Sequence, residues 1–265
     1  MTLACIDIGN THTHIGVWEK GEFLQLDNLS SKEWIHKPEA LKKYLQHTEA
    51  DSLTFASVVP SAVPVLLDVA HSLKTDYYHL NHKTCPGLPI HYPKPSEIGE
   101  DRLANAIAAA HLYHSPAIVI DMGTAVTFDV IDQDGAYEGG IIAPGIQVMT
   151  RYLHEQTALL PEIDESDLLV DHVTGKSTQE AMQVGCVIGF SGMIHALLDS
   201  LLQECANKYS TPVTLLGTGG SAAYLLHKYF PDIIIDKELS LRGLAYAYQS
   251  YGNPSREPSN VREKE

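Results

Sequence analysis

Two short segments of the chain share an Asp-x-Gly pattern followed by threonine, and these residue types have the chemistry to bind phosphate. Asp7-Ile8-Gly9-Asn10-Thr11 follows an apolar run near the start, and Asp121-Met122-Gly123-Thr124 follows a second apolar run in the middle. A glycine after a strand lets the backbone approach a phosphate and direct N–H groups at it, while the aspartate can hold magnesium or its water. Each copy alone is typical of a tight turn. As a pair, they predict two similar folded units that bind one polyphosphate from opposite sides.

A third segment has the chemistry to bind and activate a hydroxyl substrate. Gly99-Glu100-Asp101-Arg102 closes a proline-rich loop and opens an alanine-rich helix. An aspartate can accept the proton of a hydroxyl, and an arginine can bind a carboxylate with its two-pronged guanidinium. The structural alternative is a capping Asp101 followed by an exposed Arg102, and without context the residues favour that alternative.

Two glycine-rich segments of the second half have more than one interpretation. Residues 217–222 lie between a predicted strand and a predicted helix, and Asp236 ends the next strand, which fits a loose dinucleotide-binding fingerprint. That fold needs further strands after Asp236, whereas only one helix and a tail remain. We therefore favour a wall of an adenosine pocket for residues 217–222. Residues 139–145 form either the opposite wall or a simple strand-to-helix transition.

Composition excludes several classes of partner. The chain has 18 Lys and Arg against 33 Asp and Glu, a formal net charge of −15, so we expect neither nucleic acid nor an anionic membrane as a partner. The most apolar stretch, residues 184–198, is shorter than a membrane span, and no signal peptide is predicted, so we expect a cytoplasmic protein. The cysteines show no paired spacing and are predicted to be buried, reduced thiols: Cys5, Cys85, Cys186 and Cys205.

The elements that must position these residues follow a similar order in both halves. Strands are predicted at 3–7, 14–18, 23–29, 53–58 and 77–80, with helices at 38–47, 63–73 and 101–114. The second half predicts strands at 117–121, 126–131, 137–142, 213–216 and 233–236, and helices at 145–156, 177–205 with interruptions at its glycines, after 220, and 240–248. The pattern predicts an α/β protein with mixed sheets, in domains 1–115 and 116–250 with a flexible tail over 251–265.

Taken in order, these motifs resemble the bacterial type III pantothenate kinases, members of the acetate and sugar kinase/Hsp70/actin superfamily. The similarity runs from about Leu3 to Tyr248 and includes both Asp-x-Gly segments, the segment from Tyr92 to Arg102, and the glycine-rich segments. The resemblance implies two RNase H-like (actin-like ATPase) domains with the nucleotide in the cleft between them. It also implies ATP-dependent phosphorylation of pantothenate to 4'-phosphopantothenate, the first step of coenzyme A biosynthesis.

The same resemblance implies a role for each matched residue. Asp101 would be the general base, and Asp121 would bind a monovalent cation, K⁺ or NH₄⁺, beside the Mg²⁺ that accompanies ATP. Thr178 would reach into the partner subunit's pantothenate site, so the active site would be shared across a homodimer. The implied pantothenate-binding residues are Tyr92, Gly99, Glu100, Asp101, Arg102 and Thr178, and the implied ATP-binding residues are Asp7, Ile8, Gly9, Asn10, Thr11, His12, Thr13, His14 and Thr124.

Two departures and two alternative functions accompany this resemblance. Glu100 replaces a residue that is often small, and we expect it to point to solvent; Met122 replaces a frequent cysteine. One alternative function is a non-catalytic regulatory relative of the same fold, which the presence of Asp7, Asp101 and Asp121 argues against. The other is a kinase of another small hydroxy acid or sugar, since a fold alone does not select a substrate.

Overall fold

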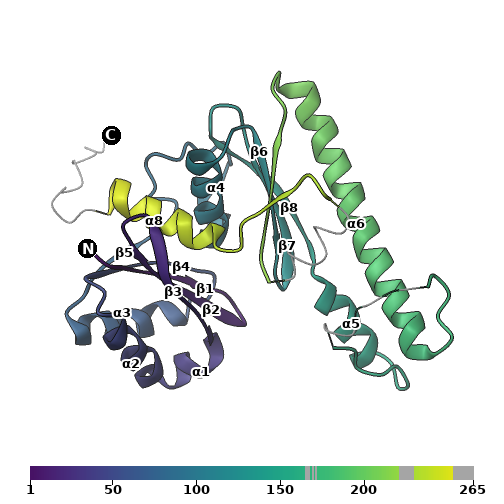
Figure 1. Cartoon of the computed structure of the whole chain (residues 1–265), viewed down its shortest axis with the longest axis horizontal. Coiled ribbons are helices and arrows are strands. Elements are labelled where there is room, and N and C mark those ends of the chain that lie inside the picture. The colour runs from purple at the N-terminus through teal and green to yellow at the C-terminus, as the bar shows by residue number, and fades with distance from the viewer. Residues whose placement is uncertain (165–167, 169, 171, 221–229, 253–265) are drawn as a thin grey trace. The chain divides into compact units, whose positions relative to one another are not determined.

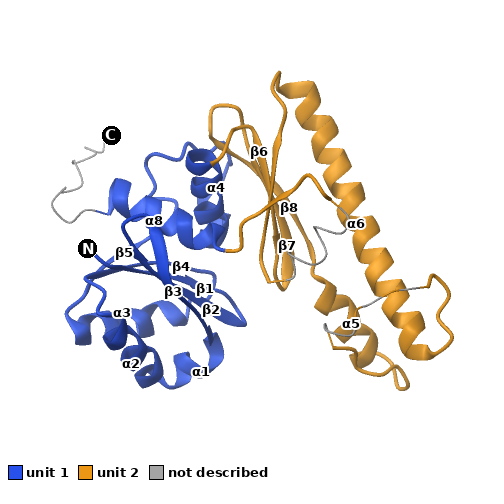
Figure 2. Cartoon of the chain, in the orientation of Figure 1, with its two compact units in different colours: residues 1–112, 238–265 blue, residues 113–237 orange. Residues whose placement is uncertain are grey.

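The chain folds into two compact units. The computed structural model describes residues 1–164, 168, 170, 172–220 and 230–252. Residues 1–112 and 238–265 form unit 1, and residues 113–237 form unit 2 (Figure 2). Each unit is built on its own five-stranded sheet (Figure 1).

The two sheets have the same topology. Unit 1 contains β1 (Leu3–Ile8), β2 (His12–Glu19), β3 (Glu22–Ser30), β4 (Ser52–Ser57) and β5 (Asp76–His79), in the order β3-β2-β1-β4-β5. Unit 2 contains β6 (Ala117–Met122), β7 (Ala125–Ile131), β8 (Tyr137–Pro144), β9 (Thr214–Thr218) and β10 (Ile234–Ile235), in the order β8-β7-β6-β9-β10. In each sheet the first three strands are antiparallel and the last two run parallel to the first. The predicted α/β fold with two mixed sheets is confirmed.

The repeated aspartates occupy equivalent positions in these sheets. β1 and β6 are paired with a neighbouring strand on both edges, and five of the six residues of each are buried, which agrees with their almost continuously apolar sequences. Asp7 is the second-last residue of β1, and Asp121 is the second-last residue of β6. The turns that follow differ by one residue, because three residues join β1 to β2 and two join β6 to β7.

Helices cover both faces of the sheet in unit 1. α1 (Ser31–His36), α2 (Pro38–Thr48) and α3 (Ala62–Leu73) pack their apolar residues on the face that carries Ala4, Ile6 and Ile8. α4 (Glu100–Leu112) and α8 (Leu239–Tyr251) contact the strands from the other face (Figure 1). The short 3₁₀ helix η1 (Pro95–Glu97) precedes α4.

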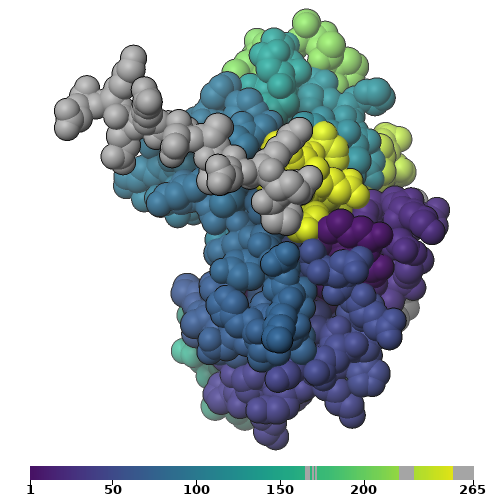
Figure 3. Space-filling model, turned by 90° about the vertical axis from the view of Figure 1, so that its left-hand side faces the viewer, coloured from purple at the N-terminus to yellow at the C-terminus, as the bar shows by residue number. Residues whose placement is uncertain are grey.

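The last helix belongs to unit 1, whereas the sequence placed it in a domain over 116–250. α8 packs against α4 so closely that a Cβ on Gly243 would lie 1.9 Å from the Ala104 carbonyl oxygen. Ser240 Oγ also donates a buried hydrogen bond of 2.9 Å to Asn105 Oδ1. In the space-filling view the surface of α8 borders that of the N-terminal residues (Figure 3). The glycine and the alanines of these helices permit this approach.

Unit 2 contains α5 (Ile146–Glu155) and the long helix α6 (Thr178–Lys208). α6 runs for 31 residues without the interruptions predicted at its glycines, because a helical glycine costs only about 1 kcal/mol relative to alanine. An 18-residue window of α6 has a mean hydropathy of 1.6 and is 39% buried, so its length and composition alone would allow it to cross a membrane. The predicted helix after Gly220 falls largely, and the tail from residue 253 entirely, outside the described residues.

The four cysteines are free and buried, as predicted. Burial raises the pKa of the Cys85 thiol to about 11, so this thiol stays protonated at neutral pH. These cysteines are packing residues of the two units.

Candidate active site

The first Asp-x-Gly segment forms a tight turn at the end of β1. The Gly9 N–H donates to the His12 carbonyl oxygen at 3.0 Å. A Cβ on Gly9 would lie 2.9 Å from that same oxygen, so a larger residue would push the turn open. Asn10 and Thr11, at the tip, are exposed. The turn therefore offers its backbone and these two side chains to solvent.

Residues on both sides of this turn alternate between the two faces of the sheet. Asp7 lies opposite His14 in the β1–β2 register, and Ile8 lies opposite Thr13. His12 and His14 are exposed, whereas Ile8 and Thr13 are fully buried on the face that α1–α3 cover. Partial burial, and then the neighbouring His12, lower the pKa of His14, so its ring is neutral at neutral pH. Of the predicted ATP-binding residues, Ile8 and Thr13 therefore have side chains that point away from Asp7.

Asp101 lies in the first turn of α4, where the predicted substrate segment begins the helix. Its Oδ1 accepts a hydrogen bond of 2.8 Å from the Arg102 N–H. A Cβ on Gly99 would lie 2.5 Å from that oxygen, so the glycine leaves room for the carboxylate. Burial raises the pKa of Asp101, while the Arg102 N–H and the Arg102 charge oppose the rise. Arg102 itself is only 9% exposed, so the structural alternative of an exposed arginine does not hold.

Glu100 does not point to solvent, contrary to the expectation from the sequence. Its Oε2 accepts hydrogen bonds from the Ser57 N–H at 2.7 Å and from His79 Nε2 at 2.8 Å. The His79 ring in turn stacks on Phe55, with ring centroids 4.3 Å apart. Glu100 therefore ties the start of α4 to the ends of β4 and β5. Its neighbours Ser57 and His79 were not identified from the sequence, because nothing local marks a contact between distant segments.

The turn after β1 and the start of α4 meet at one edge of the unit 1 sheet. The Val58 N–H donates to the Ile8 carbonyl oxygen at 3.1 Å, and the adjacent Ser57 N–H donates to Glu100. β1 and β4 are parallel neighbours, so their carboxyl ends lie together. Asp7 is on the face that α4 contacts, because strand side chains alternate and Ile6 and Ile8 face the other helices. A predicted phosphate turn and a predicted base are thus brought together.

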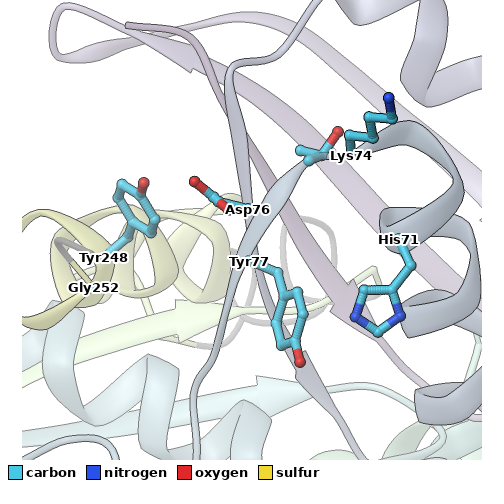
Figure 4. Close-up of a pocket in the computed structure, with 7 residues that line it drawn as sticks. His71, Lys74, Asp76, Tyr77, Tyr248 and Gly252 are labelled. Atoms are coloured by element: carbon cyan, nitrogen blue, oxygen red, sulfur yellow. The ribbon is translucent and has the colours of Figure 1, made fainter. Parts of the chain in front are cut away.

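Two polar cavities of unit 1 differ in their relation to this edge. A cavity of about 530 Å³ is lined by residues 57–58, 81–83 and 96–100, and so includes Gly99 and Glu100. A second cavity of about 460 Å³ lies beside β5, between α3 and the end of α8, and includes Lys74, Asp76 and Tyr248 (Figure 4). No predicted site residue is among the described residues that line the second cavity.

Tyr92, a predicted pantothenate-binding residue, lies in the loop before η1 and is partly exposed.

In unit 2 the predicted cation and nucleotide residues also converge on one edge. Asp121 lies opposite Thr218 in the parallel β6–β9 register. Gly219 has a φ of +90°, and a Cβ there would lie 2.7 Å from Asp121 Oδ1. The Gly145 N–H donates to the Thr124 carbonyl oxygen at 3.1 Å. Both glycine-rich segments therefore reach the turn after β6, as a nucleotide pocket requires.

The competing dinucleotide interpretation is weakened by the position of Asp236. Its Oδ2 accepts a hydrogen bond of 2.8 Å from the Tyr113 hydroxyl, and its N–H donates to the Gly217 carbonyl oxygen at 2.9 Å. Asp236 is only 7% exposed. The backbone N–H of Asp236 thus ties the end of β10 to β9, and its carboxylate is bound to Tyr113 and is not presented to a ribose.

Thr178 is exposed at the first turn of α6. The preceding Ser177 caps the helix and accepts from the Glu180 N–H at 3.1 Å. Thr178 also borders an apolar groove of about 540 Å³ between α5 and α6, together with Met149, Tyr152, Leu153, Leu160, Ala181, Met182, Gly185 and Cys186.

We predict that Glu100→Ala lowers the free energy of unfolding by about 1–3 kcal/mol, because two partly buried donors lose their shared acceptor. Glu100→Gln keeps an acceptor oxygen and should lose less. Urea unfolding of the three proteins measures the effect. An unchanged stability of Glu100→Ala would show that the contacts to Ser57 and His79 contribute nothing.

Comparison with known proteins places the chain among pantothenate kinases. The family model for type III pantothenate kinase matches residues 3–200. A type III pantothenate kinase from Methylacidiphilum infernorum is 38% identical over 239 residues, which cover 90% of this chain and 85% of the relative. Another from Finegoldia magna is 35% identical over 254 residues, covering 91% of this chain and 95% of the relative.

Solved structures share the fold at lower identity. A Baf family protein from Campylobacter jejuni, described as a conserved putative transcriptional activator, matches with a TM-score of 0.60 at 20% identity, covering 94% of this chain and 99% of that one. The activator of the 2-hydroxyisocaproyl-CoA dehydratase from Clostridium difficile, with bound ADPNP, matches with a TM-score of 0.54 at 14% identity, covering 98% and 99%. Identities this low compare folds and not activities.

Proposed function

The chain belongs to the type III pantothenate kinase family, and on that premise we propose which residues carry out its reaction. The enzyme phosphorylates pantothenate with ATP in coenzyme A biosynthesis. The observation that supports our assignment is the meeting of the Asp7–Thr11 turn and Asp101 at the carboxyl ends of β1 and β4. Phosphoryl transfer needs mainly alignment and neutralisation of charge, and this edge offers groups for both.

Asp101 is the proposed general base. Its carboxylate would accept the proton of the primary hydroxyl late in the transfer, when the oxygen is already bonding to phosphorus. Burial raises its pKa, which strengthens it as a proton acceptor at neutral pH. Gly99 leaves space for the carboxylate, and Arg102 and Tyr92 are the proposed contacts to the pantothenate carboxylate and chain.

Nucleotide contacts are proposed for residues of each unit in turn. In unit 1, the turn from Asp7 to His14 would donate backbone N–H groups to the phosphates, and Asp7 would hold the Mg²⁺ that accompanies ATP. In unit 2, Thr124 would contact the nucleotide and Asp121 would bind K⁺ or NH₄⁺. The oxygen-only donors at both aspartates suit hard cations. When bound, these cations neutralise phosphate charge that the acidic protein would otherwise repel.

A homodimer is proposed to complete the site, with Thr178 contributing to the partner's pantothenate pocket. The apolar groove beside Thr178 supports this, as does the open space that a Cβ would meet at Gly185 and Gly192 on α6. Helix faces with small residues allow a second helix to approach closely. This arrangement gives α6 a protein partner, in keeping with a cytoplasmic enzyme.

We predict a mass of twice 29.1 kDa by light scattering after gel filtration. Thr178→Ala should raise the KM for pantothenate without changing this mass, because Thr178 would contact substrate at the edge of the interface. A fully active monomer would contradict the shared site.

The choice of acceptor is tested by supplying ATP with pantothenate, with glucose or with a small hydroxy acid, and identifying the phosphorylated product by mass spectrometry. Phosphopantothenate should be the main product. Preferential phosphorylation of a sugar would contradict the proposed acceptor site, and no product from any acceptor would support the regulatory alternative.

A further inference from the structure

Three buried side chains behind the turn after β1 are joined by hydrogen bonds. The Trp34 Nε1–H donates to Thr13 Oγ1 at 2.8 Å, Thr13 Oγ1 and Ser31 Oγ are 2.8 Å apart, and Ser31 Oγ donates to the Gly9 carbonyl oxygen at 2.7 Å. Thr13 is 0% exposed, and Ser31 and Trp34 are each 1% exposed. We call these residues the Trp34–Thr13–Ser31 network.

The donor and acceptor of each hydrogen bond in this network follow from the number of hydroxyl hydrogens available. The single hydroxyl hydrogen of Ser31 is used toward Gly9, so the hydrogen between the two hydroxyls must come from Thr13. Thr13 can then only accept from Trp34, as its geometry shows. Every link therefore points toward the Gly9 carbonyl. Such ordered bonds in a buried site polarise one another and hold one arrangement.

Ser31 holds the turn at two points. Its hydroxyl binds the Gly9 carbonyl oxygen, and its N–H donates to the Thr11 carbonyl oxygen at 3.1 Å. The peptide between Gly9 and Asn10 is planar and trans, so holding the Gly9 carbonyl toward the core directs the Asn10 N–H away from it. That N–H meets no acceptor among the described residues. An outward N–H at the tip of a glycine turn is the group that binds phosphate.

We propose that Thr13, Ser31 and Trp34 are positioning residues that aim the backbone of the phosphate-binding turn, and that the Thr13 side chain does not itself contact ATP. The inference rests on the proposed function for the identity of the ligand as a nucleotide. It assigns Thr13 a different role from its neighbours because its side chain lies on the face opposite Asp7 and His14. α1 carries both Ser31 and Trp34 and so brings them behind the turn.

The test removes the hydroxyl of Thr13 while keeping its shape. Thr13→Val and Ser31→Ala should each raise the KM for ATP about 10- to 100-fold, because a turn displaced by a fraction of an ångström loses its alignment with phosphate. Thr13→Ser keeps the hydroxyl and should restore ATP affinity to within about threefold of wild type. The Kd of pantothenate should stay unchanged in all three.

Thr54 supplies a matched control in the same sheet. Its Oγ1 is buried and has no hydrogen-bond partner among the described residues, so Thr54→Val removes an equivalent hydroxyl without touching the turn. Thr54→Val should leave the KM for ATP unchanged. Circular dichroism at the assay temperature shows whether each variant is folded. Trp34→Phe, which removes the indole donor of the network and keeps an aromatic ring, replaces any variant that is not.

Binding of a non-hydrolysable ATP analogue, measured by calorimetry, separates this inference from the proposed function. Wild type should bind the analogue whether or not pantothenate is the acceptor, and folded Thr13→Val should bind it at least about tenfold more weakly. Equal binding by folded Thr13→Val, Ser31→Ala and wild type would overturn the positioning role. A loss in Thr13→Ser as large as that in Thr13→Val would also overturn it, because packing and not the hydroxyl would then matter.

Discussion

Asp101→Asn is expected to lower kcat by about two to four orders of magnitude while pantothenate still binds, because a positioned general base contributes about that much. The amide keeps the size and the acceptor oxygen that the Arg102 N–H meets at 2.8 Å, so the pocket should survive. Steady-state kinetics give kcat, and calorimetry gives the Kd of pantothenate. A variant with near-normal kcat would exclude Asp101 as the base.

The pH dependence of kcat/KM also tests whether Asp101 is the general base. The base works deprotonated, and burial raises the pKa of Asp101, so the acidic limb of the wild-type profile should lie above the usual range of an aspartate. This limb should be missing in Asp101→Asn. A limb that persists unchanged in the variant would assign the titration to another group.

Stability provides an internal control for Asp101→Asn. An acid whose pKa is raised by folding stabilises the protein below its unfolded pKa, and that contribution is lost as the pH rises through its folded pKa. At neutral pH the charged form of Asp101 therefore lowers the free energy of unfolding, and Asp101→Asn should unfold at the same or a higher temperature than wild type.

Asp76→Asn is the matched control for activity. Asp76 is an exposed carboxylate at the second cavity of unit 1, so this variant should keep wild-type kcat (Figure 4).

Activity is expected to depend on potassium or ammonium and to fall at least about tenfold in buffer that contains only sodium. Sodium is smaller, and a site sized for potassium holds it poorly. Asp121→Asn should weaken the response to potassium about 10- to 100-fold, since an interaction with a charged group contributes about 1.5–3 kcal/mol. The potassium concentration for half-maximal activity measures this.

Gly219→Ala tests the same site without removing the carboxylate. A Cβ at this position would lie 2.6 Å from the Met122 carbonyl oxygen and 2.7 Å from Asp121 Oδ1, so it would displace the aspartate. Its potassium response should resemble that of Asp121→Asn. Full activity of wild type in sodium alone would contradict a role for Asp121 in binding the monovalent cation.

The sequence predicted the fold well because its strongest signals are local. The apolar runs before Asp7 and Asp121 are central strands, and such strands are recognisable without knowledge of their neighbours. α1 was missed although Ser30 and Glu33 form a cap signature, because six residues are too short for a clear helical period. α8 was assigned to the wrong unit, since chain order does not reveal that Gly243 packs on Ala104.

The site was predictable in its residue types and less so in their contacts. Glycine turns and the start of α4 are visible in the sequence, but the partners of Glu100 lie on β4 and β5 and are joined only by folding. Thr13 was grouped with its exposed neighbours because motif matching ignores strand alternation. The register with Ile8 and the bond from Trp34 show which way it points.

Pantothenate kinase activity is tested most directly by ADP release from the purified protein, measured with ATP and Mg²⁺ in potassium buffer, with and without pantothenate. We expect release that depends on pantothenate, is stoichiometric with phosphopantothenate and is nearly abolished in Asp101→Asn. ADP release that pantothenate does not stimulate, from a folded protein that binds ATP, would contradict it.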